Sequence, residues 1–447
     1  MKKSLLVFVS IVMSAGTLCA QRSLTLEESK ALALKNNFKI KNSALETEAA
    51  AQTKKAAFTN FFPTISATGF TFEAAKDLFE MTTEGGNLPV YDGNPANIPG
   101  ATQFAYFPSS TTGMMKTGTI GAVNATQPIF AGGRIINGNK LASLGEDISE
   151  LEQRISKNDV LLKTEEDYWQ VVSLNEKLKT IQRYEDLLSN LLKQVDDAYA
   201  SGLVMKNDVL KVEVKRSEVL LNKSKLEGGK KLALMAFCQC VGIQYDSTLV
   251  LSDSLKMDGI PQSYYASPDE ALKKRAEYDL LQASVRAEKL QTRMKLGEYM
   301  PQVAVGASEM YIKFDEGQDR TIGMVFGTVS IPISGWWEAS HTLSERKVKE
   351  EIAENNLKEN SQLLELQIQK AWQDLTDAYM LVQLSEETKK QAEENLKVNE
   401  DSYKNGMSTL SDLLEAQAML QQANDQLTDA KASYQVKKVE YLQATGR

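Results

Sequence analysis

The sequence repeats itself at one constant spacing, and this repeat limits the possible folds more than any other feature. The spacing of 204 residues separates Pro128 from Pro332, Tyr199 from Tyr403, Gly202 from Gly406, Asp208 from Asp412, and Gly242 from Gly446. Chance rarely holds one offset over so long a stretch, whereas a duplicated structural unit does. We therefore expect two copies of one unit, residues 21–242 and 268–447, joined by a linker over residues 243–267.

The two copies differ in length near their beginnings. Pro63, in FFPTISATG, matches Pro301, in YMPQVAVGA, at a spacing of 238 residues rather than 204. The 34 extra residues fall between Pro63 and Pro128 and include TTEGGNLPVYDGNPANIPG, which is rich in Gly, Pro, Thr and Asn. This composition predicts a long exposed loop in the first copy only.

Each copy also contains very long helical segments. Residues 134–200 contain no proline, and their apolar residues alternate at spacings of three and four, which is typical of a coiled-coil seam. Such a helix would extend for roughly 100 Å, which no compact domain needs. In the last helix an apolar or aromatic residue recurs every seven positions, at Leu413, Leu420, Leu427, Tyr434 and Tyr441. A strict seven-residue period predicts left-handed supercoiling against neighbouring helices.

Four segments have the composition of membrane-barrel strands. They are residues 64–72, 117–129, 303–314 and 321–331, in two hairpins over residues 63–130 and 301–333. Each is close to the roughly nine to eleven residues that a tilted barrel strand needs. Four strands cannot close a barrel, whereas three subunits would supply twelve.

Prolines and aromatic residues gather where strand is expected to give way to helix. Because proline cannot donate to a strand ladder, we expect it at the rim, at Pro63, Pro128, Pro301 and Pro332. Phe130, Trp336 and Trp337 fall at the same level. We expect them to form an aromatic belt at the membrane interface, with ordinary packing at the junction as the alternative.

The N-terminus predicts export from the cytoplasm. Lys2 and Lys3 precede a short apolar run, and small residues lead to Ala20, so residues 1–20 are expected to be a cleaved signal peptide. The rest of the chain has 49 basic against 59 acidic residues, which argues against nucleic acid as a partner. No later stretch of eighteen apolar residues occurs, so any membrane-spanning part is expected to be a closed β-barrel.

The sequence offers little for catalysis or metal binding. It has one histidine, His341, and no nucleophile elbow, P-loop, zinc-protease motif or dinucleotide-binding glycine motif. Cys238 and Cys240 lie two apart on an expected helix, without a second cluster, so we expect buried packing residues. We therefore expect no enzymatic activity, no cofactor and no metal.

Together these features resemble the TolC-type outer membrane efflux proteins over essentially the whole mature chain. The resemblance rests on the two-copy plan, on QPIFAGGR after the second strand with IPISGWW at the equivalent place, and on breaks of the form Y-x-x-G followed by Asp and Leu. It implies a mixed, mainly α fold. In a homotrimer, each protomer would give four strands to a twelve-stranded transmembrane β-barrel above a long-helix periplasmic α-barrel. The N-terminal segment, the linker and the C-terminal end would form a collar around the helices.

The same resemblance implies a function and partners. The protein would be a passive channel in the outer membrane of a Gram-negative bacterium, with a periplasmic gate. It would work with a periplasmic adaptor (membrane fusion) protein and an inner-membrane pump of RND or ABC type. The cargo would be drugs, toxic compounds or metals, in a tripartite efflux or type I secretion system. A periplasmic coiled-coil adaptor is the alternative, but the doubled strand hairpins argue against it.

Four residues fall on the gate positions of this family. Asp412 and Glu415 match the acidic rings, Tyr403 matches the latch tyrosine, and Asp208 matches its acceptor. Ser408 stands where the family has a latch arginine. Three copies of the acidic pair would repel one another, raise their pKa values and attract cations. The residues alone also allow a second interpretation, in which both aspartates are N-terminal helix carboxylates and Tyr403 packs between helices.

Overall fold

The computed structural model describes residues 23–257, 259–314 and 319–447, so the expected signal peptide lies outside the described residues. The chain divides into two compact units. The first comprises Met1–Ala50, Glu146–Val285 and Ala353–Arg447, and the second comprises Ala51–Gly145 and Arg286–Ile352. Each unit therefore contains residues from both of the expected copies.

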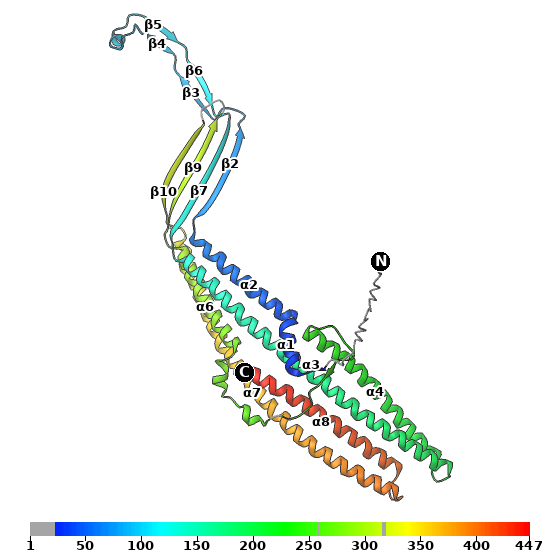
Figure 1. Ribbon diagram of the computed structural model, residues 1–447. Helices are drawn as coiled ribbons and strands as arrows, with labels where there is room; N and C mark the ends of the chain where they lie inside the picture. The colour runs from blue at the N-terminus through cyan, green and yellow to red at the C-terminus, as the bar shows by residue number, and fades with distance from the viewer. Residues whose placement is uncertain (1–22, 258, 315–318) are drawn as a thin grey trace, which may run out of the picture. The chain divides into compact units, whose positions relative to one another are not determined.

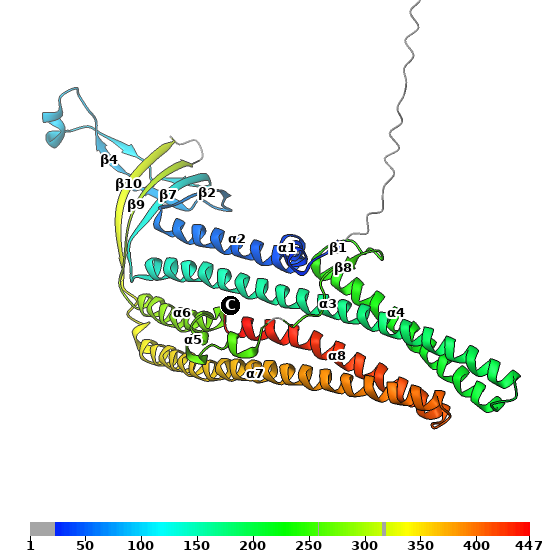
Figure 2. The ribbon, with the colours of Figure 1, turned by 60° about the horizontal axis from the view of Figure 1, so that its bottom comes forward.

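Four long helices dominate the first unit. They are α3 (Arg134–Ala200), α4 (Lys206–Val241), α7 (Trp336–Lys404) and α8 (Leu410–Ala444). The bounds of α3 are those that the proline-free segment predicts. In the first unit, α4 lies back along α3 and α8 lies back along α7, as Figures 1 and 2 both show. Helices α2 (Phe38–Phe58), α3, α6 (Ala276–Glu298) and α7 contribute residues to both units.

The seven-residue period of α8 marks its buried face. Leu413, Tyr434 and Tyr441 are buried, and Leu427 packs against the cluster that contains the two tyrosines. A buried tyrosine hydroxyl needs a hydrogen-bond partner, and both find one in the segment before α5. The Tyr434 hydroxyl donates to the carbonyl of Gly259 (3.0 Å), and the Tyr441 hydroxyl accepts from the N–H of Ala266 (3.0 Å).

The N-terminal segment and the segment between α4 and α5 also meet in the first unit. Strand β1 (Ser23–Leu24) pairs in parallel with β8 (Val250–Leu251). The first unit also contains the shorter helices α1 (Leu26–Asn36), η3 (Pro261–Tyr264) and α5 (Pro268–Leu272). The Arg447 guanidinium donates to the carbonyl of Tyr264, which joins the C-terminus to the same segment.

A four-stranded antiparallel sheet lies in the second unit. Its order is β10 (Arg320–Ser330), β9 (Gln302–Phe314), β7 (Thr117–Ala131) and β2 (Thr64–Glu73). Among the described residues β2 and β10 have no outer neighbour. Each strand has at least ten residues, enough for a tilted crossing of a bilayer.

Pro128 is not at the end of its strand, where the sequence predicts it. Strand β7 continues to Ala131, and the register with β9 shifts between Pro128 and Phe130. A β-bulge tolerates a residue without an N–H, so proline can stand inside the strand at this point. Pro63 and Pro301 directly precede β2 and β9, and Pro332 follows β10 by two residues. These three prolines therefore stand next to the strand ends, as the sequence predicts.

The 34-residue insertion is not a plain loop, which corrects the expectation from composition. Strand β3 (Phe79–Thr83) pairs with β6 (Ser110–Met114), and β4 (Gly86–Pro89) pairs with β5 (Phe104–Phe107). A short 3₁₀ helix, η2 (Pro95–Gly100), follows β4, and another, η1 (Thr59–Phe61), precedes β2. The side chains of the insertion are nevertheless mostly exposed.

Candidate functional site at the two helix breaks

The four residues expected at a gate lie beside two breaks between long helices of the first unit. The first break, Ser201–Met205, joins α3 to α4, and the second break, Asn405–Thr409, joins α7 to α8. Their glycines have left-handed backbones, with φ of +71° at Gly202 and +72° at Gly406. Glycine adopts this conformation without the steric cost that a Cβ would bring.

Hydrogen bonds show that the two helices end in the same way. The N–H of Gly202 donates to the carbonyl of Tyr199 (2.9 Å), and the next N–H donates to Ala198 (2.8 Å). At the second break, Gly406 donates to Tyr403 (3.0 Å), and the following N–H donates to Ser402 (2.8 Å). Both are Schellman motifs, which satisfy the last carbonyls of a helix.

The Asp412 side chain takes part in the N-terminal cap of α8. Its side chain accepts from the backbone N–H of Thr409 (2.8 Å) and from the Thr409 hydroxyl (2.7 Å), which in turn accepts from the N–H of Asp412 (3.2 Å). This reciprocal arrangement is a capping box. The hydrogen bonds from Thr409 hold the pKa of the Asp412 carboxyl below its usual value. The protomer therefore gives Asp412 the role of a helix-terminal carboxylate.

Asp208 occupies the same position in α4 with different chemistry. The residue at the N-cap is Met205, which offers no side-chain oxygen, and no side-chain capping bond forms there. Asp208 instead accepts from Lys211 Nζ at 3.2 Å, three residues along the helix. The position equivalent to Lys211 in α8 is Glu415. The first break therefore carries a balanced ion pair where the second carries two acids.

Glu415 and Asp412 share an exposed face of α8. They are three residues apart, which places them on adjacent turns of one helix side, and both side chains are exposed. The residues between them, Leu413 and Leu414, are buried. The apolar face of α8 thus packs inward, and the two acids face away from it.

Tyr403 packs against an apolar cluster formed by helices on either side of the two breaks. The cluster draws side chains from α3, α4 and α8, including Leu188, Val209 and Leu413, and Tyr403 lies partly buried beside it. Burial, followed by the nearby Asp208 carboxylate, raises the pKa of the Tyr403 hydroxyl. Of the residues described, however, Asp208 is not a hydrogen-bond partner of that hydroxyl. The Ser408 hydroxyl donates to the carbonyl of Asn399 (3.4 Å).

The expected rim residues lie in the second unit, where several aromatic side chains are exposed. Phe130 is 47% exposed, Trp336 49% and Trp337 80%. The Trp336 indole donates to the carbonyl of Tyr299 (2.8 Å), which fixes one of the two tryptophans to the end of α6. Trp337 is the most exposed of the three.

The close backbone contact between Gly132 and Gly297 was not anticipated from the sequence. A Cβ added to Gly132 would lie 2.1 Å from the carbonyl oxygen of Gly297, and one added to Gly297 would lie 2.3 Å from that of Gly132. Only glycine allows such an approach, so this pair joins the start of α3 to the end of α6. The glycine doublet before α3 was a visible signal, but its partner is far away in the chain.

Two side-chain interactions near the breaks were not anticipated from the sequence. Thr409 precedes Asp412 by three residues, and this spacing is a known capping signature that the sequence displays. Lys211 was visible as the counterpart of Glu415, but its bond to Asp208 was not considered. Both interactions are local, so helical spacing could have revealed them.

The described residues give no sign of a metal centre. Across residues 23–257, 259–314 and 319–447, no group of three or more His, Cys, Asp or Glu side chains could hold a metal ion. Cys238 and Cys240 are buried and, among the described residues, form no disulfide; burial raises the pKa of the Cys240 thiol. In the same part of the chain, no helix is both long and apolar enough to cross a membrane.

Comparison with known proteins adds a family and a fold. A family model described as "Outer membrane efflux protein" matches residues 31–242 and 268–447. No curated protein matches the chain. The structure is similar to the Campylobacter jejuni CmeC outer membrane channel, with 16% identity, a TM-score of 0.76, and coverage of 94% of this chain and 85% of that one.

Two further solved structures have the same fold. The outer membrane protein VceC of Vibrio cholerae is 13% identical, with a TM-score of 0.72 and coverage of 94% of this chain and 96% of that one. The MtrE outer membrane channel of Neisseria gonorrhoeae, in its open state, is 13% identical, with a TM-score of 0.73 and coverage of 94% and 88%. At such low identity these similarities establish the fold.

Proposed function

Since the chain belongs to the TolC-type outer membrane efflux protein family, we propose that it is the outer-membrane channel of a tripartite efflux or type I secretion system. It would be a passive conduit that catalyses no reaction. The match of one family model to both 31–242 and 268–447 carries this proposal, and it also supports an internal structural repeat. In this proposal residues 1–20 direct the chain out of the cytoplasm and are removed.

The proposed assembly is a homotrimer with a twelve-stranded β-barrel. The sheet β10–β9–β7–β2 supports it because its outer strands leave backbone donors and acceptors unpaired. In a bilayer each unpaired group costs several kcal/mol, so a spanning sheet must close. Pairing β2 of one protomer with β10 of the next, three times over, would remove every edge. The exposed Trp336 and Trp337 would then lie at the outer-membrane lipid interface.

The proposed gate lies at the two breaks. Three copies of Asp412 and Glu415 around one axis would form an acidic constriction that attracts cations. Burial and, after it, the nearby Asp208 carboxylate raise the pKa of the Tyr403 hydroxyl, and this proximity of Asp208 to Tyr403 supports a latch between the two side chains when the gate closes. Ser408 cannot replace the bidentate ion pair of an arginine, so the latch would be weaker than one that contains arginine.

The proposed partners are a periplasmic adaptor protein and an inner-membrane pump of RND or ABC type. The cargo would be small molecules such as drugs, toxic compounds or metals. The helix breaks support a periplasmic docking end because they expose apolar side chains. Leu203 is 79% exposed and Met407 74%. Such side chains are usually covered in an assembled complex.

Reconstitution of the full chain tests this function. We expect the protein in the outer-membrane fraction, as a heat-modifiable trimer that forms pores in planar bilayers. Release as a soluble species without detergent would contradict the barrel. A membrane-bound trimer that never conducts, even when the gate is weakened, would contradict the channel.

A double variant tests the latch. Tyr403→Phe with Asp208→Ala removes both proposed partners, so we expect a higher single-channel conductance. Tyr199→Phe, at the equivalent position of the first copy, is the matched control. Its ring lies 5.5 Å from Lys206 Nζ, and that contact does not use the hydroxyl. Unchanged conductance in the double variant would place the latch elsewhere.

A further inference from the structure

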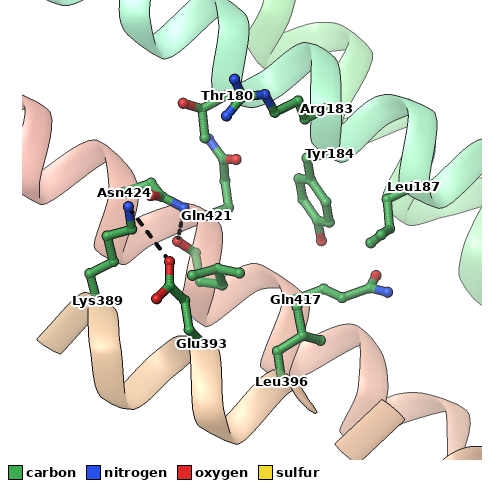
Figure 3. Close-up of a pocket in the computed structure, with 11 residues that line it drawn as sticks. Thr180, Arg183, Tyr184, Leu187, Lys389, Glu393, Leu396, Gln417, Gln421 and Asn424 are labelled. Atoms are coloured by element: carbon green, nitrogen blue, oxygen red, sulfur yellow. Dashed lines mark hydrogen bonds and ion pairs between the residues drawn. The ribbon is translucent and has the colours of Figure 1, made fainter.

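A cavity of about 280 Å³ lies between α3, α7 and α8 in the first unit. Figure 3 shows Tyr184 reaching into it from α3, Gln417 from α8, and Leu396 from α7. Asp412 and Glu415 are not among the residues that line this cavity. The space is many times the ~30 Å³ that one water molecule occupies in the liquid.

Two buried polar atoms in the cavity wall lack hydrogen-bond partners. Tyr184 is 8% exposed and Gln417 5%, and neither the Tyr184 hydroxyl nor Gln417 Oε1 has a partner among the described residues. A buried polar atom left unpaired costs about 1–3 kcal/mol, and such atoms are rare in folded proteins. Their placement on one cavity suggests that an occupant satisfies both.

The chemistry of these two atoms defines the occupant's polar group. Gln417 Oε1 is an acceptor, so it needs a donor. Burial raises the pKa of the Tyr184 hydroxyl to about 12, with a smaller effect from Glu218, so the hydroxyl stays protonated and can donate. A primary carboxamide carries the complementary pair, one N–H donor and one carbonyl acceptor. A carboxylate offers acceptors only and would leave Gln417 Oε1 unpaired.

The rest of the wall accommodates an apolar ring. Leu187, Leu396 and Leu420 line the cavity together with polar side chains and the guanidinium-bearing Arg183. At the wall, Lys389 and Glu393 form an ion pair at 3.6 Å, so these two charges offset each other. The volume is slightly below the ~300–1,000 Å³ of drug-sized sites, which favours a single ring with a short polar group.

We propose that this cavity binds a small neutral aromatic carboxamide, whose amide N–H donates to Gln417 Oε1 and whose carbonyl accepts from the Tyr184 hydroxyl. The site would bridge both helical hairpins of the protomer, since α3 belongs to one, and α7 and α8 to the other. The proposal concerns binding alone and does not depend on channel activity.

Titration of the detergent-solubilised full chain tests the proposal, with nicotinamide as the probe. We expect saturable binding, and at least tenfold weaker binding by Tyr184→Phe with Gln417→Leu, which removes both polar atoms at similar size. Tyr184→Phe alone preserves the ring packing and should show a smaller loss of affinity. Tyr199→Phe, on the same helix but outside the cavity, should bind as the unmodified chain does.

Nicotinate distinguishes the polar groups on the unmodified chain. Its carboxylate replaces the amide on the same ring, and we expect at least tenfold weaker binding. Equal binding of the two probes would overturn the carboxamide assignment. Absence of saturable nicotinamide binding, or a cryo-EM map at high nicotinamide concentration with only water-sized density in the cavity, would overturn the site itself.

Discussion

The two helix breaks have the same backbone but different side-chain chemistry. Both end a long helix with a Schellman motif on a left-handed glycine, and both place an aspartate at the third position of the next helix. In the second break that aspartate belongs to a capping box, and an acid follows one turn later. In the first, it pairs with a lysine. The two breaks therefore share a backbone conformation and differ in charge, so they can serve different functions.

The largest expected effect tests the shared backbone. Gly202→Ala and Gly406→Ala each place a Cβ on a left-handed residue, which costs about 1–2 kcal/mol. A Cβ at either glycine would have no atom within 4 Å, so conformational strain alone should act, and equally in both. Hydrogen exchange at the ends of α3 and α7 should accelerate by about 5–30-fold in the respective variants. A clear difference between the two would show that the breaks are not equivalent in backbone energetics.

The next effect tests the difference in capping. Thr409→Ala removes the hydroxyl that caps α8, so we expect a loss of about 1 kcal/mol, measured as faster exchange in the first turn of that helix. Met205→Ala is the matched control in α4 and should change little, because Met205 makes no side-chain capping bond. Equal losses would mean that the capping box contributes no stability.

A smaller effect should follow when the first break is given the chemistry of the second. Met205→Thr provides the missing hydroxyl, and Asp208 stands at the position required for a capping box. The new cap would be offset by weakening of the bond from Lys211 to Asp208, so we expect a gain of a few tenths of a kcal/mol. Slower hydrogen exchange at the start of α4 would show this gain in stability, and faster hydrogen exchange there would refute it.

The smallest effect is the pH dependence of the second break. The folded pKa of Asp412 is lowered, so its contribution is present above the ordinary value of 3.8 and is lost as the pH falls through the folded value. Protection of the first turn of α8 should fall over this acidic range, and Asp412→Asn should abolish the dependence. A transition above pH 3.8 in the assembled trimer would show that repulsion between the acids outweighs the cap.

Helical spacing and repeat offsets predicted most of the long elements. Residues 134–200 have no proline and end beside Gly202, so both ends of α3 were visible in the sequence. The strands of the insertion were not predicted. They form by pairing of β3 with β6 and of β4 with β5, whose partners lie up to about thirty residues apart in the sequence and have an irregular composition. Their Gly and Pro content masked that pairing.

The candidate site was only partly visible in the sequence. The equivalence of Asp208 and Asp412 follows from the 204-residue spacing. The role of Asp412 as a helix N-terminal carboxylate was one of the two interpretations that the sequence allowed, the other being an acidic ring. The approach of Tyr403 to Asp208 joins different hairpins, and the cavity between Tyr184 and Gln417 joins α3 to α8. Neither relation has a local sequence signal, because each depends on how the helices pack.

Block of single channels by multivalent cations tests the central claim, that the second break carries an acidic gate and the first does not. Asp412→Ala with Glu415→Ala should weaken the block, because six carboxylates would leave the constriction of a trimer. Asp208→Ala with Lys211→Ala removes an ion pair of no net charge at the equivalent positions, and the block should persist. If the block persists in the first double variant, or weakens equally in both, the acidic gate lies elsewhere.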